Sequence, residues 1–405
     1  MILKGLQFAV WGMAAIACIY YAIVLYSAWR FFRRSAPLLP GKPDFRGDFS
    51  PPVSILKPIR GLDPDAYENF ASFCRLDYPE YEIVYCVGDT SDPALPTIQR
   101  VMRDFPQRRI RVLIGSGRTA VNDKVAKLVR LTAEAKYETL VINDSDVRVR
   151  PDYLRTMTAP LEDPGTGAAT CFYVPVPAEE KRFVQRLQSV GMLSDFYAGL
   201  LVARQLDGVK FALGPSIATT RKHLASFGGY QVMENRPADD LLVGRLIAEQ
   251  GYRVALLSYA VETVSDFHSL HDLFLKRLRW TVVMRNFRSW GHLGLIFTLG
   301  LPWALLAVAM QPSWGVTLGF LGAYFAFRVA MLMTIGGWGL SQPDTHRKIP
   351  LIPVWDLMSL CVWLVSFTRN SIRWRDGYYL IRNGELVPID RARGVRAAEK
   401  APEHI

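Results

Sequence analysis

The sequence is poor in cysteine and in charge. Its 405 residues include five cysteines, which are scattered along the chain and form no CxxC pair. This spacing excludes a disulfide framework and a cysteine zinc site, so we expect the main domain to face a reducing compartment. Charged residues make up 21% of the chain and hydrophobic residues 50%. That balance excludes intrinsic disorder and collagen-like repeats.

The sequence also lacks both common glycine-rich phosphate loops. Neither a GxGxxG fingerprint nor a Walker A loop is present, so any phosphate group must be held by other means. An excess of 48 Lys and Arg over 37 Asp and Glu gives a net charge of +11, which suits nucleic acid or a membrane surface. Because no basic-aromatic strand platform or nucleic-acid-binding motif occurs, we expect no nucleic acid partner.

A long apolar run lies near the N-terminus. Residues 8–29 carry no charge and are long enough to cross the roughly 30 Å of hydrocarbon in a bilayer as a helix. Arg30, Arg33 and Arg34 follow directly, and the positive-inside rule places what comes after them in the cytoplasm. We therefore expect a membrane anchor over residues 1–34 and a cytoplasmic main domain.

Further apolar runs lie near the C-terminus. Residues 291–340 predict a transmembrane hairpin, with spans of roughly 293–310 and 314–340. Arg328 falls inside the second span and is costly there unless it faces protein, water or a headgroup. Residues 349–368 form a third C-terminal apolar segment, which contains Asp356 and two prolines. If it spanned the bilayer, the basic tail over residues 369–405 would lie outside, so we favour a re-entrant or interfacial segment.

Residues 49–285 have the pattern of an α/β domain. Short β-branched runs alternate with helical patterns, which predicts a mostly parallel, Rossmann-like sheet covered by helices. The expected strands are 53–56, 82–87, 111–114, 139–142 and 167–174, and the expected helices are 65–74, 93–105 and 123–136. A ligand of such a sheet sits at the carboxyl ends of its strands.

Two of these strands end in carboxylates. Asp144 and Asp146 form a DxD triplet after strand 139–142, where they can offer hard oxygen ligands to Mg²⁺ or Mn²⁺ bridging a diphosphate. Asp89 and Asp92 follow strand 82–87. An Asx turn and a helix N-cap are the structural alternative for this second pair.

Two later motifs can be explained either by structure or by chemistry. Asp239 and Asp240 open an amphipathic helix that reaches residue 250. The helix dipole accounts for acids in a first turn, although one of the pair could be a general base. Residues 276–280, Lys-Arg-Leu-Arg-Trp, precede the hairpin and alone are typical of a juxtamembrane anchor.

In order along the chain, these motifs resemble the D, D, D, (Q/R)xxRW signature of membrane-bound GT-A glycosyltransferases. The matching residues are Asp92, Asp144-Ser-Asp146, Asp240 and Arg279-Trp280. More narrowly, the chain resembles the ceramide glucosyltransferase family and its bacterial relatives, some of which act on hopanoids. Supporting segments are 57–64, 76–82, 91–94, 121–124, 148–152 and 371–375. Lys276 stands where the motif has Gln or Arg, so we assign it no catalytic role.

The resemblance implies a GT-A fold and a metal-dependent reaction of a UDP-sugar, with glucose or a related hexose transferred. It implies that Asp146, with Asp144 near it, holds Mg²⁺ or Mn²⁺ on the diphosphate. Further contacts with the donor are then expected from one of two carboxylates near the uridine and from two amines near the nucleotide or phosphates. These residues are Asp89 or Asp92, and Lys57 and Lys124.

The resemblance also implies an inverting transfer to the hydroxyl of a membrane lipid, ceramide-type, at the cell inner membrane. Asp240 is then the base, Arg279 neutralises the departing diphosphate, and Trp280 floors the acceptor site. An interfacial helix near residues 181–206 would admit the lipid from the bilayer, or is a core helix. The alternatives are transfer of N-acetylglucosamine or another sugar to a hopanoid polyol, a processive polysaccharide synthase, and a non-catalytic membrane protein.

Overall fold

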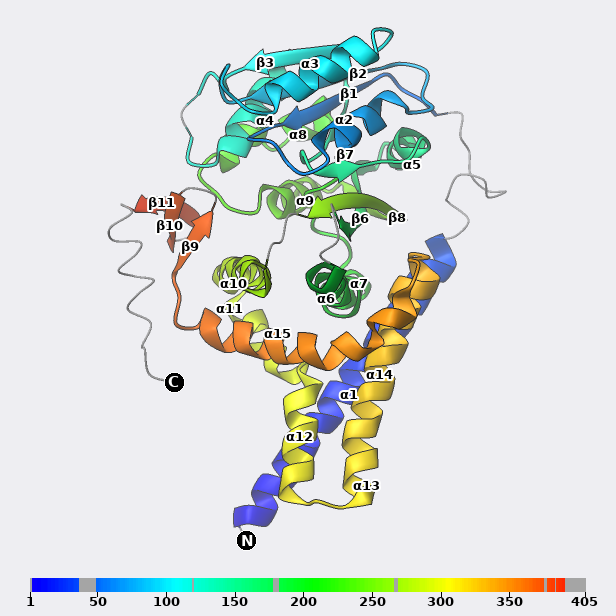
Figure 1. The fold of residues 1–405 in the computed structure, drawn as a ribbon, viewed down its shortest axis with the longest axis vertical. Helices are drawn as coiled ribbons and strands as arrows, with labels where there is room; N and C mark the ends of the chain where they lie inside the picture. Colours follow the sequence, from blue (N-terminus) through cyan, green and yellow to red (C-terminus); the bar gives the residue numbers. More distant parts are fainter. Residues whose placement is uncertain are drawn as a thin grey trace. The chain divides into compact units, whose positions relative to one another are not determined.

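The computed structural model describes residues 2–35, 49–118, 120–177, 182–265, 269–374, 377–382 and 384–389 (Figure 1). The chain divides into two compact units. The sheet unit comprises residues 34–180 and 207–266, and the helical unit comprises residues 1–33, 181–206 and 267–405. Residue 181 of the expected interfacial helix, and the tail from residue 390 onward, lie outside the described residues.

Among the described residues of the sheet unit, eight strands form one sheet in the order β3-β2-β1-β4-β7-β6-β8-β5. The strands are β1 (Val53–Pro58), β2 (Tyr81–Val87), β3 (Arg109–Ile114), β4 (Thr139–Ile142), β5 (Val147–Arg148), β6 (Thr166–Pro177), β7 (Ile217–Thr220) and β8 (Arg253–Ser265). Its helices are α2 (Ala66–Cys74), α3 (Leu95–Asp104), α4 (Asp123–Glu134), α5 (Tyr153–Thr158), η2 (Ala159–Glu162), α8 (Arg221–Ala225), η4 (Tyr230–Met233) and α9 (Asp239–Glu249).

The predicted parallel arrangement is found on both sides of β1. Strand β1 pairs in parallel with β2 and with β4, and Val53 lies opposite Tyr81 and Thr139. Every residue of β1, β2 and β4 is buried, as expected for parallel strands covered on both faces. The prediction of an α/β fold is confirmed. Strand β7, which runs antiparallel between β4 and β6, was not predicted.

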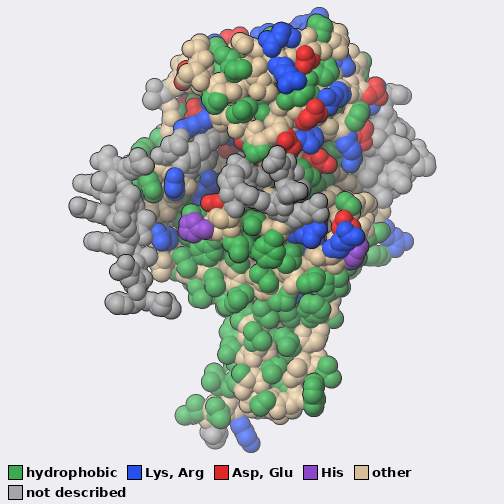
Figure 2. Space-filling model, in the orientation of Figure 1, with side chains coloured by type: hydrophobic (Ala, Val, Ile, Leu, Met, Phe, Trp, Pro, Cys, Tyr) green, Lys and Arg blue, Asp and Glu red, His purple; other side chains and the backbone are tan. Residues whose placement is uncertain are grey.

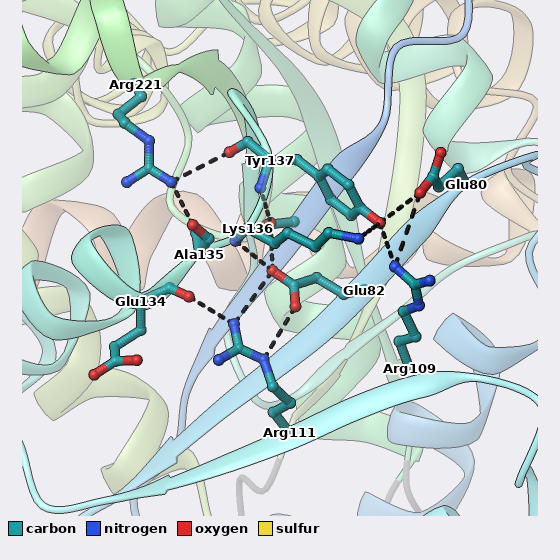
Figure 3. Close-up of polar contacts among 10 residues, drawn as sticks. Glu80, Glu82, Arg109, Arg111, Glu134, Ala135, Lys136, Tyr137 and Arg221 are labelled. Carbon is teal, nitrogen blue, oxygen red and sulfur yellow. Dashed lines mark hydrogen bonds and ion pairs between the residues drawn. The ribbon is translucent and has the colours of Figure 1, made fainter.

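A polar network ties together the amino-terminal ends of the parallel strands (Figure 3). The buried Glu82 carboxylate on β2 accepts hydrogen bonds from Ser54 Oγ and Lys136 N, both at 2.6 Å, and from Arg111 Nε at 3.1 Å. Tyr137 Oη donates to Glu80 at 2.7 Å. This network lies at the end of the sheet opposite the strand ends that carry the predicted site.

The helical unit contains both apolar ends of the chain. Its long helices are α1 (Ile2–Ser35), α6 (Arg182–Gly191), α7 (Tyr197–Asp207), α10 (Leu270–Phe287), α12 (Gly300–Met310), α14 (Ala323–Leu332) and α15 (Ile352–Ser366), and the π-helical turn η3 (Met192–Phe196) joins α6 to α7. Shorter turns are α11 (Ser289–Gly294), η5 (Leu295–Phe297), α13 (Trp314–Val316), η6 (Thr317–Gly322), η7 (Met333–Gly339) and η8 (Thr345–Leu351). Strands β9 (Ser371–Trp374), β10 (Gly377–Arg382) and β11 (Glu385–Ile389) form an antiparallel sheet. This sheet, which lies within the basic tail, was not predicted.

Within the described residues, three helices are long and apolar enough to cross a membrane. They cover Ile2–Arg34, Trp314–Gly339 and Thr345–Ser366. A fourth candidate is a pair, Ser289–Phe297 and Gly300–Met310, bent by 42° at the break. Figure 2 shows hydrophobic side chains covering the face of α12, α13 and α14 that is drawn. In Figure 1, α15 runs crosswise to α1, α12 and α14.

The charged residues inside two apolar segments form a buried ion pair. Arg328 on α14 and Asp356 on α15 are 4% and 7% exposed, and the Arg328 guanidinium pairs with both carboxylate oxygens of Asp356. Tyr324 Oη donates to the same carboxylate at 2.7 Å, and Arg328 also donates to the Ser194 carbonyl. Arg328 thus faces protein, which is one of the environments that lower the cost of a charge inside an apolar span.

Candidate active site

The carboxyl ends of the parallel strands bring the predicted site residues to one edge of the sheet. Lys57 is the fifth residue of β1, Asp89 follows β2, and Asp144 and Asp146 follow β4. Because β1 lies between β2 and β4, these residues share one end of the sheet. The DxD triplet therefore lies at a strand end, as its position in the sequence predicts.

Lys124 joins the DxD triplet to the acidic pair at the start of α9. It is the second residue of α4, a helix capped by the Asn122 side chain, which accepts from Val125 N at 3.3 Å. Lys124 Nζ lies 2.8 Å from Asp144 Oδ1 and 3.2 Å from Asp239 Oδ2. Burial acts to lower the pKa of Lys124, but the surrounding carboxylates outweigh it and hold that pKa well above its usual value. Lys124 is therefore a fixed cation.

Two backbone amides hold the Asp240 carboxylate. Gly214 N donates to Asp240 Oδ2 and Leu241 N donates to Oδ1, each at 2.8 Å. Burial, reinforced by the negative charge of Asp239, raises the pKa of Asp240 to about 6, although Lys124 opposes the shift. A carboxylate of this pKa is a stronger base than an ordinary aspartate and is still ionised at neutral pH.

Lys57 lies beneath the DxD triplet rather than at the surface. Its side chain is fully buried, its Nζ donates to the Asp144 carbonyl oxygen at 3.0 Å, and it sits 3.8 Å from the centre of the Phe73 ring. Burial lowers the pKa of Lys57 to about 7, against the opposing effect of Asp146 and Asp144. In this arrangement Lys57 supports the loop that carries the carboxylates.

Asp89 and Asp92 make the turn and cap contacts that the sequence analysis named as their structural alternative. Asp89 Oδ1 accepts from Ser91 N at 2.7 Å and from Ser91 Oγ at 2.5 Å. Asp92 Oδ1 accepts from Ala94 N at 3.0 Å, and its Oδ2 accepts from Gly61 N at 3.3 Å. Asp92 is 9% exposed. Because Gly61 follows β1 and Asp92 follows β2, their hydrogen bond joins the two loops at this edge of the sheet.

The carboxylates of this site suit a hard divalent cation shared with a substrate. No group of three or more His, Cys, Asp or Glu side chains able to hold a metal occurs in the part of the chain that the structure describes. Asp144 and Asp146 can supply carboxylate oxygens, and a diphosphate and water can complete the ligands, as Mg²⁺ sites commonly do. Three carboxylates act on Lys124, so this cluster has a net negative charge and favours a cation.

Sequence reasoning missed three residues that shape this site. Gly214 supplies the amide for Asp240, and its only signal is the Gly-Pro pair with Pro215, which marks a turn. Ala238, just before α9, has φ 57° and ψ 54°, a left-handed conformation that costs a non-glycine residue about 1 kcal/mol or more. The buried Tyr230 hydroxyl has no hydrogen-bond partner among the described residues. Burial, together with the negative charge of Asp239, raises the pKa of Tyr230.

Arg279 and Trp280 lie on α10 of the helical unit. The Trp280 ring is 6.1 Å from the Phe196 ring on η3, and Lys276 Nζ and the Arg277 guanidinium lie 5.5 and 5.7 Å from it. Trp280 therefore belongs to an aromatic and cationic cluster within the helical unit. Most of the segment 181–206 packs inside this unit as α6, η3 and α7; an added Cβ at Gly191, for example, would collide with the Trp355 ring.

Comparison with known proteins agrees with these features. Residues 9–387 match the family described as Glycosyl transferase family 21. Ceramide glucosyltransferase 3 of Caenorhabditis elegans is 24% identical over 94% of this chain and 82% of its own length. Ceramide glucosyltransferase of Gibberella zeae is 29% identical over 47% of this chain and 36% of its own length.

Solved structures also resemble the chain. The mannosyltransferase PcManGT from Pyrobaculum calidifontis, in complex with GDP-Man and Mn²⁺, covers 87% of this chain and 99% of its own at 19% identity and a TM-score of 0.49. The family match extends over nearly the whole sequence, and the resemblance to ceramide glucosyltransferases is confirmed. The chain is a glycosyltransferase and belongs to glycosyl transferase family 21.

Proposed function

We propose that the protein transfers a hexose, most simply glucose, from a UDP-sugar to the hydroxyl of a ceramide-type membrane lipid, with inversion and with a divalent cation. The observation that carries the proposal is the linked cluster of Asp144, Lys124, Asp239 and Asp240 at the carboxyl edge of the sheet. It combines carboxylates for a cation, a fixed positive charge and a base of raised pKa. Its family relatives, named as ceramide glucosyltransferases, support the acceptor class.

In this mechanism Asp144 and Asp146 hold Mg²⁺ or Mn²⁺, which when bound offsets the negative charge of the donor diphosphate. Lys57 keeps the DxD loop in place through the Asp144 carbonyl. Lys124 holds the Asp144 and Asp239 carboxylates together and is close enough to the DxD triplet to contact a phosphate bound there.

Asp240 removes the proton from the acceptor hydroxyl as that oxygen attacks the anomeric carbon from the face opposite the diphosphate. The amides of Gly214 and Leu241 fix its carboxylate, and its raised pKa suits a base working near neutral pH. Arg279 neutralises the departing diphosphate and Trp280 floors the acceptor site. No covalent enzyme intermediate is needed, because a single displacement inverts the anomeric centre.

The proposal places the sheet unit in the cytoplasm, where nucleotide sugars are made, and the apolar helices in the cell inner membrane. The arginines after the N-terminal apolar run support this orientation. A cysteine introduced at the partly buried surface position Ser116 should then escape membrane-impermeant labelling in intact cells. Labelling from outside would contradict the orientation.

Purified full-length protein in lipid nanodiscs tests the reaction. UDP-glucose, UDP-N-acetylglucosamine and UDP-glucuronate are each offered with ceramide and with a hopanoid polyol, and mass spectrometry identifies the products. We expect glucosylceramide from the wild type and at least a hundredfold less from Asp240→Asn. Arg279→Ala should also weaken UDP retention, since it removes a cation from a phosphate, whereas Asp240→Asn should leave UDP-sugar affinity nearly unchanged. A product made only from the hopanoid would replace ceramide as the acceptor.

A further inference from the structure

The helical unit contains a small pocket lined by charged, hydroxyl and indole side chains. Its volume is about 70 Å³, and it is formed by η3, α10, α15 and the break between η5 and α12. Its lining includes Asp195, Arg277, Thr281, Trp355, Ser359 and Trp363. All of them lie in the helical unit.

Asp195 is the acceptor group of this pocket. Its Oδ2 receives three donors, all at long distances: Trp355 Nε1 at 3.3 Å, Arg277 Nη2 at 3.4 Å and Ser359 Oγ at 3.5 Å. Hydrogen bonds to a carboxylate are ordinarily 2.7–2.9 Å long. Asp195 therefore has weak partners, and its side chain is still 40% exposed. A ligand donor can form a shorter bond with it.

The backbone around the pocket is irregular in two places. Asp195 lies on η3, a π-helical turn, and such turns inside helices are frequent at functional sites. Thr298 and Leu299 line the pocket at the break where two apolar helices meet at 42°. In an apolar segment, non-helical backbone is tolerated where it is buried in protein or lines a cavity. Both irregularities converge on the same pocket.

The charges of the pocket indicate a neutral ligand. Asp195 and Arg277 offset each other, and the nearby Arg328 and Asp356 are already paired. The hydroxyls of Thr281 and Ser359 add polar groups, while indole rings from Trp355 and Trp363 supply apolar walls. A phosphate would meet the Asp195 carboxylate, whereas a hydroxyl or amide N–H would donate to it. The volume suits a polar headgroup and is too small for a whole lipid.

The geometry points to a binding site for the uncharged headgroup of the acceptor lipid, in which Asp195 accepts a hydrogen bond from a hydroxyl or amide N–H of that lipid. The inference rests on the proposed function for the identity of the lipid as acceptor. It adds residues that select the acceptor. Arg277 stands at an unspecified position of the (Q/R)xxRW motif, and the other five lie outside the signature. Ceramide and a hopanoid polyol share the required donor groups, and the experiment separates them.

The test compares acceptor and donor kinetics of full-length protein in nanodiscs. Asp195→Asn removes the charge but keeps the shape, and Ser359→Leu fills the pocket while leaving Asp195 in place. Each should raise the apparent KM for the acceptor about tenfold or more, the usual loss for a charge-assisted hydrogen bond. The KM for UDP-sugar and the hydrolysis of UDP-sugar without acceptor should stay within twofold. Asp344→Asn, at an exposed carboxylate of the same unit, is the matched control.

A binding measurement makes the result independent of transfer. Photoactivatable ceramide and a photoactivatable hopanoid polyol are crosslinked to the protein, and labelled peptides are mapped by mass spectrometry. We expect the true acceptor to label peptides from η3 or α15 and unlabelled phosphatidylglycerol not to compete. If no lipid is glycosylated but a neutral lipid still labels the pocket, the site stands and the proposed function fails. Labelling elsewhere, competition by phosphatidylglycerol, or an unchanged acceptor KM in both variants would overturn the site.

Discussion

The effect of the position of the Asp240 carboxylate on catalysis can be tested without replacing Asp240 itself. An added Cβ at Gly214 would lie 2.9 Å from Asp240 Oδ2 and 3.5 Å from its Cγ. Non-bonded heavy atoms prefer separations of about 3.5 Å or more, so in Gly214→Ala the carboxylate must retreat by roughly half an ångström. The same retreat lengthens the 2.8 Å bond from Gly214 N.

The expected effect follows from how steeply catalysis depends on position. A misplacement of about 1 Å can cost about a hundredfold in rate, so we expect kcat of Gly214→Ala to fall about tenfold. The hydrogen bond from Gly214 N stabilises the ionised carboxylate, so weakening it should raise the pKa of Asp240. The acidic limb of the pH–rate profile should then move to higher pH. The KM for UDP-sugar should change little, since neither Gly214 nor Asp240 is proposed to contact the nucleotide.

Initial rates between pH 5 and 8, with thermal unfolding in the same detergent, measure both effects. Gly294→Ala serves as the control, since an added Cβ there meets nothing within 4 Å. A Gly214→Ala protein that unfolds at the wild-type temperature and turns over within twofold of wild type would refute the assignment of Asp240 as the base. A normal kcat with a raised KM for the lipid would instead assign Gly214 to acceptor binding.

Three further predictions use the same preparations. Exhaustive chelation should stop transfer and Mg²⁺ or Mn²⁺ should restore it, while Asp146→Ala should lose most activity and unfold normally; full transfer in excess chelator would contradict the metal site. For the wild type, the rate should fall as the pH drops through about 6, where Asp240 becomes protonated, and this limb should be absent from the residual rate of Asp240→Asn. Glu82→Gln should lower the free energy of unfolding by about 2–4 kcal/mol without changing turnover per folded molecule, because buried donors lose a charged acceptor. Burial acts to raise the pKa of Glu82, but its hydrogen bonds hold it below the usual value; its stabilisation should therefore be present above about pH 4.3 and disappear as the pH falls through the lower folded pKa.

Strands β1, β2 and β4 could be predicted because every residue in them is buried. A short apolar run such as Thr139–Ile142 is typical of a buried strand, and the predicted strand has the observed bounds. The short β7 has the sequence Ile-Ala-Thr-Thr and carries no such signal. It is a strand because β4 and β6 lie on either side of it, a condition that no local pattern contains.

The site divides in the same way between local and long-range information. A strand followed by a DxD triplet predicts where Asp144 and Asp146 lie, because both features are local. The contacts of Lys124 could not be predicted, since they join a residue at the start of α4 to carboxylates 20 and 115 positions later in the chain. The role of Gly214 could not be predicted for a related reason. Its contact with Asp240 is made by the backbone amide, and backbone contacts depend little on residue type.

Arg328 and Asp356 show what a sequence can reveal even when it hides a partner. Each residue interrupts an apolar segment, and each alone makes that segment a poorer membrane span. Their pairing removes both objections, since the guanidinium satisfies the carboxylate and Tyr324 supplies a further donor. The two charges also join α15 to α14, which α15 crosses in Figure 1. A charge in an apolar run thus indicates that a partner exists, and the fold determines which residue it is.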